Sequence, residues 1–162
     1  MHPPVLRSFS LLLCVAIQVF VAFQTTNISS GSSTVASEDS PPWHSPSKEF
    51  AFEFCRINNQ NIFLLAIWFD TIPDKTIVRY PKQQNPAPEG SKLELSVDGQ
   101  FTLTTPQGQK IWKPTSVFDK FAYAAMLNTR NFILVGKDFS PVWESFGEPA
   151  TILPMQVMEL GG

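Results

Sequence analysis

Few side chains of this sequence are suited to catalysis. Beyond the first two dozen residues there is one histidine, His44, and one cysteine, Cys55. A thiol becomes an effective nucleophile beside a base, and the sequence offers Cys55 no obvious base partner, so we expect a buried, inert cysteine. One histidine and one cysteine are also too few ligands for a zinc site. The sequence therefore predicts no enzyme activity, no metal site and no cofactor.

The motifs of phosphoryl transfer are missing as well. Residues 1–162 contain no G-x-G-x-x-G loop, no V-A-I-K strand and no H-R-D segment, which are the parts that a protein kinase needs. The net charge is -2, and no run of Lys or Arg occurs. A nucleic-acid-binding or membrane-surface protein would carry a basic patch. We therefore expect no kinase activity and no nucleic-acid partner.

The first residues have the composition of a targeting segment. Arg7 precedes an uncharged, mostly apolar stretch over residues 8–23, which predicts a secretory signal peptide at residues 1–24, with cleavage expected within residues 22–26. The alternative is an uncleaved anchor, although the stretch is short for crossing a bilayer. We expect a secreted chain, or one tethered at the plasma membrane by its N-terminus. That membrane contact requires the segment to remain uncleaved.

A sequon for N-glycosylation follows this segment directly. Asn27, Ile28 and Ser29 form the N-x-S pattern, which is an acceptor when it lies at the surface of a secreted chain. The sequence therefore predicts a glycoprotein carrying a glycan on Asn27.

The elements beyond the sequon are predicted to be short strands. Residues 50–54 alternate between Phe and other residues, and residues 62–69 form a continuous apolar run of strand length. Turn dipeptides such as Asp98-Gly99 separate the later segments. Residues 117–126 are open to a helical or a loop interpretation. The sequence as a whole predicts an all-β fold.

One phrase occurs twice in the second half of the chain. In the first copy, Phe101 and Leu103 precede Trp112; in the second copy, Phe132 and Leu134 precede Trp143. The two Trp are 31 residues apart, and so are the two Phe. A fixed period of this size indicates a repeat, in which each unit needs its neighbours to complete a core.

Several separated motifs give the chain a family resemblance. From about Asn27 to the last residue, the chain resembles the bulb-type lectin domain, also called G-type or monocot mannose-binding, as in the plant S-domain lectin receptor-like kinases. The motifs that carry this resemblance are residues 43–47, 50–52, 65–69, 72–73, 76–78, 85–86, 98–99, 143–146 and 152–154.

The resemblance implies a fold. Residues 27–162 are expected to form one lectin domain with a β-prism II fold, in which three four-stranded antiparallel sheets surround a pseudo-threefold axis. Each repeat unit is expected to place a Trp near the centre, giving a core set of Trp68, Trp112 and Trp143. In the first unit the family usually has Trp after the Val, and this chain has Arg79 there. We expect Arg79 to be partly exposed, with its long aliphatic stem packed against the base of the prism. The alternative is that the core has lost an aromatic side chain at this position.

The resemblance also implies where sugars would bind. In the family, each sheet can hold a mannose through Gln, Asp, Asn, Val and Tyr spaced two apart, and such spacing puts side chains on one face of a strand. Carried over to the second unit, this strip is Ser96, Asp98, Gln100, Thr102 and Thr104. In the third unit it is Leu127, Thr129, Asn131, Ile133 and Val135. In the first unit it is Asn61, Phe63, Leu65, Ile67 and Phe69.

None of the three strips matches the family pattern in full. The second keeps Asp98, and the third keeps Asn131 with a conservative Ile133. An Asp beside a Gly, as at Asp98, is more often a turn residue than a ligand, and Asn131 after Arg130 is also open to interpretation as a turn residue. Arg130 and Glu53 stand where the family has Gly, a residue that serves positive φ or close packing, so the local geometry is expected to differ.

Two classes of function remain open from the sequence. The first is an extracellular carbohydrate-binding module, resembling the head of a lectin receptor-like kinase ectodomain, whose eroded sites take glycans, mannose-type glycans among them. The second is a degenerate lectin scaffold that works through protein contacts, with a receptor or a like chain as partner. A truncated receptor fragment without sugar binding is a variant of the second.

Overall fold

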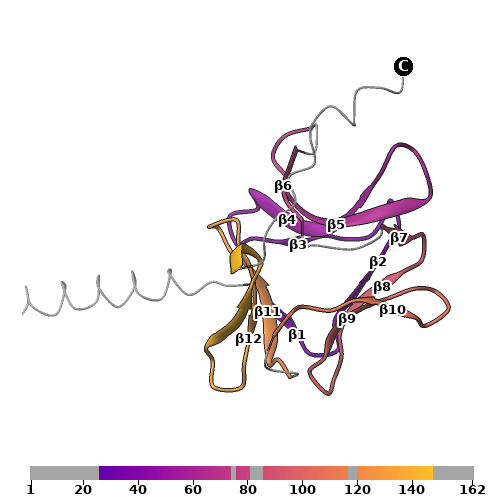
Figure 1. Cartoon of the computed structure of the whole chain (residues 1–162). Coiled ribbons are helices and arrows are strands. Elements are labelled where there is room, and N and C mark those ends of the chain that lie inside the picture. The colour runs from indigo at the N-terminus through magenta and orange to yellow at the C-terminus, as the bar shows by residue number, and fades with distance from the viewer. Residues whose placement is uncertain (1–25, 74–75, 81–85, 117–119, 148–162) are drawn as a thin grey trace, which may run out of the picture.

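The chain folds into three antiparallel β-sheets around a shared interior, as seen in a computed structural model (Figure 1). The structure describes residues 26–73, 76–80, 86–116 and 120–147. The expected signal peptide at residues 1–24 and the last part of the expected domain lie outside the described residues. Within the described ranges, no helix is long and apolar enough to cross a membrane.

The first sheet is built from the aromatic segments in the first half of the chain. Its strand order is β3-β4-β5-β6, and a short fifth strand, β7, also pairs with β5. The expectation of four strands is therefore short by one for this sheet. The bounds of its strands are β3 Trp43–His44, β4 Phe50–Arg56, β5 Ile62–Phe69, β6 Thr76–Arg79 and β7 Ala87–Pro88.

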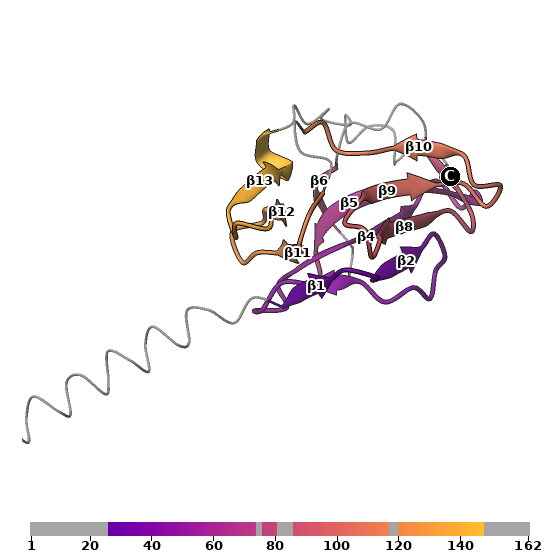
Figure 2. The ribbon, with the colours of Figure 1, turned by 90° about the horizontal axis from the view of Figure 1, so that it is seen from below.

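The second and third sheets are the two copies of the repeated phrase, each completed by a strand from the N-terminal segment. The second sheet has the order β10-β9-β8-β2, and the third has the order β1-β11-β12-β13. Figure 2 shows β1 and β2 following one another along one side of the molecule. The bounds are β1 Asn27–Ser29, β2 Ser33–Val35, β8 Lys92–Leu95, β9 Phe101–Thr104, β10 Lys110–Trp112, β11 Tyr123–Met126, β12 Phe132–Val135 and β13 Pro141–Glu144, followed by a single 3-10 turn, η1 Ser145–Gly147.

The two copies share the register of their hairpins. Trp112 lies opposite Leu103 across the β9–β10 pair, and Trp143 lies opposite Leu134 across the β12–β13 pair. In the first sheet the matching position, opposite Ile67, is occupied by Arg79. The sequence therefore located the missing Trp correctly.

The interior holds one aromatic cluster to which all three sheets contribute. Phe52 and Phe132 stack with centroids 4.0 Å apart, and Phe101 lies 5.7 Å from Phe132. Trp112 meets Trp143 edge to face at 6.1 Å. Aromatic pairs in these arrangements contribute beyond their buried area. The repeated Phe and Trp residues of the two copies thus meet in one core, which no single sheet could form alone.

Trp68 does not belong to this central set. It is fully buried, but Ile67 and not Trp68 lies in the central cluster, and successive strand residues face opposite sides of a sheet. The expected core set of Trp68, Trp112 and Trp143 is therefore corrected to Trp112 and Trp143, with Arg79 at the third position. Arg79 is half-buried, and its Nη1 donates to the Ser145 backbone oxygen at 3.0 Å.

The tight turns of the second and third sheets have the same backbone form. In the turns before β9 and β12, Gly99 and Arg130 take the left-handed conformation, with φ of 87° and 67°. In the turns after these strands, Gly108 and Phe139 do so, with φ of 83° and 62°. The third sheet thus places side chains where the second has glycine, and Phe139 is 77% exposed.

Candidate carbohydrate-binding faces

The outer face of the second sheet is polar and accessible. Phe101 and Leu103 point into the core, so Thr102 and Thr104 between them face outward and are partly exposed. Across the β8–β9 pair, Thr102 lies opposite Glu94 and Thr104 opposite Lys92. Lys92 Nζ and Glu94 Oε1 are 2.8 Å apart. This row of hydroxyl, carboxylate and ammonium groups can both donate to and accept from a polar ligand.

The other three residues of this strip form the turn at the end of the strand. Asp98 lies within the turn, and Ser96 and Gln100 flank it. The Ser96 hydroxyl donates to an Asp98 carboxylate oxygen, and the Gln100 backbone N–H donates to Ser96 Oγ at 3.0 Å. The bond from Ser96, more than any charge nearby, lowers the pKa of Asp98. The exposed carboxylate is therefore ionised at neutral pH, and can accept bonds from sugar hydroxyls.

The third sheet uses its retained amide inside the fold. Asn131 is buried; its Nδ2 donates to Glu144 Oε2 at 2.9 Å, and its Oδ1 accepts from the Ser145 hydroxyl at 2.8 Å. Ile133 is half-buried and Val135 is buried on the same face. Of the remaining strip residues, Leu127 is half-buried and Thr129 is exposed. The third strip is thus mainly an apolar surface whose amide ties β12 to β13.

The first strip lies mainly inside the fold, and only Asn61 at its start is exposed and Phe69 at its end half-buried. Phe63, Leu65 and Ile67 lie in the central cluster, so the residues carried over for this sheet face inward. Ile67, opposite Arg79, matches the inward Leu103 and Leu134, so the strip carried over for this sheet is displaced by one residue. A displacement of one exchanges the two faces of a strand. The outward residues are Leu64, Ala66 and Trp68, and all three are buried.

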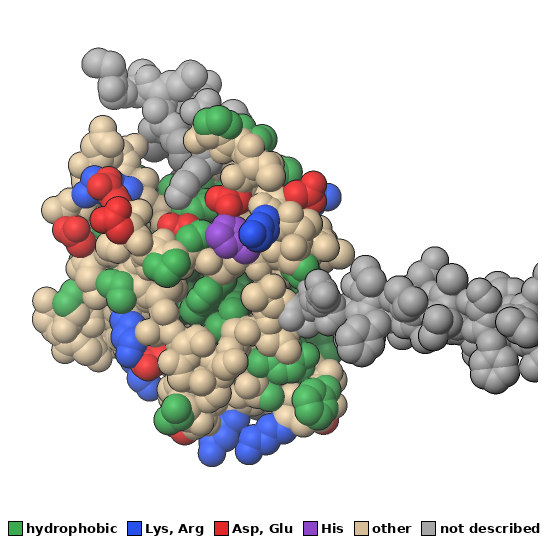
Figure 3. Space-filling model, turned by 180° about the vertical axis from the view of Figure 1, so that it is seen from behind, with side chains coloured by type: hydrophobic (Ala, Val, Ile, Leu, Met, Phe, Trp, Pro, Cys, Tyr) green, Lys and Arg blue, Asp and Glu red, His purple; other side chains and the backbone are tan. Residues whose placement is uncertain are grey.

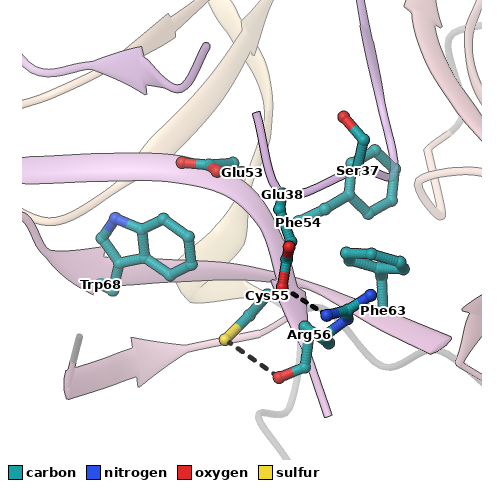
Figure 4. Close-up of a pocket in the computed structure, with 8 residues that line it drawn as sticks. All are labelled: Ser37, Glu38, Glu53, Phe54, Cys55, Arg56, Phe63 and Trp68. Atoms are coloured by element: carbon teal, nitrogen blue, oxygen red, sulfur yellow. Dashed lines mark hydrogen bonds and ion pairs between the residues drawn. The ribbon is translucent and has the colours of Figure 1, made fainter. Parts of the chain in front are cut away.

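A hollow of about 250 Å³ lies at the end of the first sheet (Figure 4). Arg56 forms an ion pair with Glu38 there and lies over the Phe63 ring, 5.9 Å from its centroid. The Cys55 thiol is half-buried and lies 3.8 Å from the Arg56 backbone oxygen. Glu53, which stands where the family has Gly, is 2% exposed. Cys55 was expected to be buried, and the structure shows it half-buried.

The structure places His44 and Cys55, the two residues that a thiol-based catalyst would need side by side, far from one another. His44 Nε2 lies 2.6 Å from Asp70 Oδ2, and both side chains are partly exposed. Figure 3 shows that acidic, basic and histidine side chains gather on one part of the surface. His44 lies opposite Ala51 on β4, and Cys55 is four residues farther along that strand. At about 3.3 Å per residue, this separation is about 13 Å. Among the described residues, no group of three or more His, Cys, Asp or Glu could hold a metal ion.

Comparison with known proteins places this fold in a family. The chain is 46% identical over 146 residues to the G-type lectin S-receptor-like serine/threonine-protein kinase LECRK2 of Oryza sativa subsp. indica, covering 83% of this chain and 18% of that protein. It is 38% identical over 168 residues to the kinase RLK1 of the same type from Arabidopsis thaliana, covering 93% and 20%. The chain carries a bulb-type lectin domain. No protein-family model matches it.

A solved structure agrees on the fold. The Japanese Marasmius oreades lectin superposes with a TM-score of 0.50 at 14% identity, covering 74% of this chain and 88% of that one. At this identity the likeness concerns the fold, which is a β-prism II. The lectin chain spans about a fifth of the length of the kinases it matches.

Proposed function

We propose that the chain is an extracellular carbohydrate-binding module that holds glycans on the outer face of the second sheet. The observation that carries this proposal is the partly exposed polar row of Thr102 and Thr104 on β9, which ends at the exposed, ionised Asp98. The relationship to G-type lectin receptor-like kinases supports it. The proposed role is non-enzymatic, because the sequence contains none of the kinase motifs.

Each residue of this face has a part in the proposed binding. Asp98 accepts hydrogen bonds from sugar hydroxyls, and the Gln100 amide both donates and accepts. The methyl group of Thr102 contacts the apolar face of the ring, as Val does in the family pattern, and Thr104 supplies a hydroxyl. A polar partner left unmatched in such a site costs about 1–3 kcal/mol. Weak binding of a mannose-type glycan is the result that we expect for so few retained groups.

A glycan array followed by titration with mannose tests this proposal. Asp98→Asn and Thr102→Ala are expected to abolish or weaken whatever binding the unmodified chain shows. The matched control is Asp138→Asn in the third sheet, because Asp138 is also exposed and also accepts from a nearby serine, Ser140. Binding that falls equally in the Asp138→Asn variant would place the site elsewhere.

A protein-binding scaffold is the second candidate function. The observation that favours it is the state of the other two sheets, where Asn131 is used internally and the outward residues of β5 are buried. If the folded chain binds no glycan on the array, the carbohydrate proposal is refuted and the scaffold remains. Sedimentation of the chain alone and with a receptor ectodomain of the G-type lectin class would then measure self-association and pairing.

A further inference from the structure

We infer that the chain's own N-linked glycan, attached at Asn27, covers Tyr123 and Ile133, the partly exposed apolar side chains on the outer face of the third sheet. This goes beyond the proposed sugar binding by the second sheet and does not depend on it. It rests only on the proposed passage through the secretory pathway. The pairing of β1 with β11, which the sequence does not reveal, places the sequon on the same face as Ile133.

The acceptor side chain is presented at the surface. Asn27 opens β1, the edge strand of the third sheet, and Ile28 next to it lies in the central cluster. Asn27 and Ser29 therefore point away from the core, and both are exposed. A glycan on this side chain leaves the core contacts of Ile28 undisturbed.

Asn27 begins a row that crosses the whole sheet. It pairs with Ala125, which pairs with Ile133, which in turn pairs with Glu144. All three residues lie outside the central cluster; Ala125 is fully buried, Ile133 is half-buried and Glu144 is exposed. With strands about 4.8 Å apart, Ile133 lies about 10 Å from Asn27 on the same face. The first sugars of an N-linked glycan can reach this distance.

The surface beside Asn27 suits the apolar side of a sugar. Ser29 pairs with Tyr123, so the Tyr123 side chain is a diagonal neighbour of Asn27, within reach of a long or aromatic residue. Tyr123 and Ile133 are both half-buried. A tyrosine offers an apolar ring and a hydroxyl at its tip. Glycan contact would cover the two partly exposed apolar side chains of this face.

The covalent step needs no oxidant and no residue of this chain besides the sequon. The donor is an oligosaccharide on a lipid pyrophosphate. The bond between the anomeric carbon and the pyrophosphate oxygen breaks, and a bond from that carbon to Asn27 Nδ2 forms. The amide loses one proton, and the lipid pyrophosphate leaves.

The test uses the full chain secreted from a eukaryotic host. Intact mass before and after peptide-N-glycosidase should show loss of one glycan from the unmodified chain. Ser29→Ala should abolish the modification while keeping Asn27, and Ser29→Thr should retain it. A secreted chain without the glycan refutes the inference, although it leaves the proposed extracellular location intact. A chain that stays inside the cell unmodified refutes both.

Tyrosine nitration then tests whether the glycan lies on the sheet. The chain has two tyrosines, Tyr80 and Tyr123, and Tyr80 lies next to β6 in the first sheet. Peptide mapping should show Tyr123 nitrated several-fold more slowly with the glycan than after its enzymatic removal, and Tyr80 nitrated equally in both. Equal nitration of Tyr123 in the two forms would show a glycan that extends into solvent and would refute the covering role.

Discussion

The second and third sheets have one backbone design and two different surfaces. Their hairpins share register and turn conformation, and both direct a Phe and a Trp into the common core. On the outer face, the second sheet has the polar, partly exposed Thr102 and Thr104, whereas the third has the half-buried Ile133 and the buried Val135 at the matching positions. The inward residues are constrained by a shared core, and the outward residues are free to differ. A repeat can therefore keep its fold while its binding faces diverge.

The largest expected effect comes from the part that the two sheets share. Trp112→Ala and Trp143→Ala should each lower the free energy of unfolding by about 3–5 kcal/mol, because each leaves a cavity in the core. Urea unfolding followed by fluorescence measures this. The double variant should cost less than the sum, because the two rings are in contact. Strict additivity would contradict the shared core.

The turns before β9 and β12 should respond unequally to the same residue. A Cβ on Gly99 would lie 2.7 Å from the Phe121 backbone oxygen, at φ of 87°, so Gly99→Ala should destabilise the fold by about 1–3 kcal/mol. Arg130→Ala should change little, because that turn already holds a side chain at φ of 67°. Thermal unfolding of the two variants compares them. Equal losses would show that the two turns are under the same constraint.

The turns after β9 and β12 differ in the same sense, with glycine in the second sheet and a side chain in the third. Phe139 is held in the left-handed conformation with its ring exposed, so Phe139→Gly should relieve strain. The gain is expected to be about 0.5–1 kcal/mol after the added freedom of the unfolded chain is subtracted. Gly108→Ala should lower stability instead. The midpoints of thermal unfolding provide the measurement, and a loss of stability in Phe139→Gly would reveal a contact made by the ring.

The smallest expected effect is a loss of stability at acidic pH. Hydrogen bonds from Ser96 and Ser140 lower the pKa values of Asp98 and Asp138. A carboxyl whose pKa is lower in the folded state adds stability above its unfolded pKa, and this stability is lost as the pH falls through the folded value. Both groups are exposed, so the loss should be slight. NMR titration should show that Ser96→Ala raises the pKa of Asp98 alone and that Ser140→Ala raises that of Asp138 alone.

The sequence predicted the parts of this molecule that repeat. The Phe and Trp period located two sheets, and the alternation at residues 50–54 identified the strand β4, whose three Phe side chains are all in the core. The strands β1, β2 and β3 were not predicted, because segments of two or three residues are too short to show a period. Their pairing is set by tertiary contacts with distant strands.

The site was harder to predict than the fold. The family pattern placed Thr102 and Thr104 on an exposed strand, but it could not show that Asn131 is bound by Glu144 and Ser145. In the first sheet, the strip carried over from the family pattern was displaced by one residue relative to the structure. A displacement of one is invisible in an apolar run such as β5, where both faces are buried.

The pairing of β1 with β11 and of β2 with β8 has a consequence for biosynthesis. The first two strands leave the ribosome early, but their partners follow much later in the chain, because about sixty residues lie between β2 and β8 and about ninety between β1 and β11. Until then both N-terminal strands have free edges, which are prone to pairing with other chains. Closing contacts between such distant segments also slows folding. We therefore expect the growing chain to be more prone to aggregation during translation than a chain whose strands pair only with their neighbours.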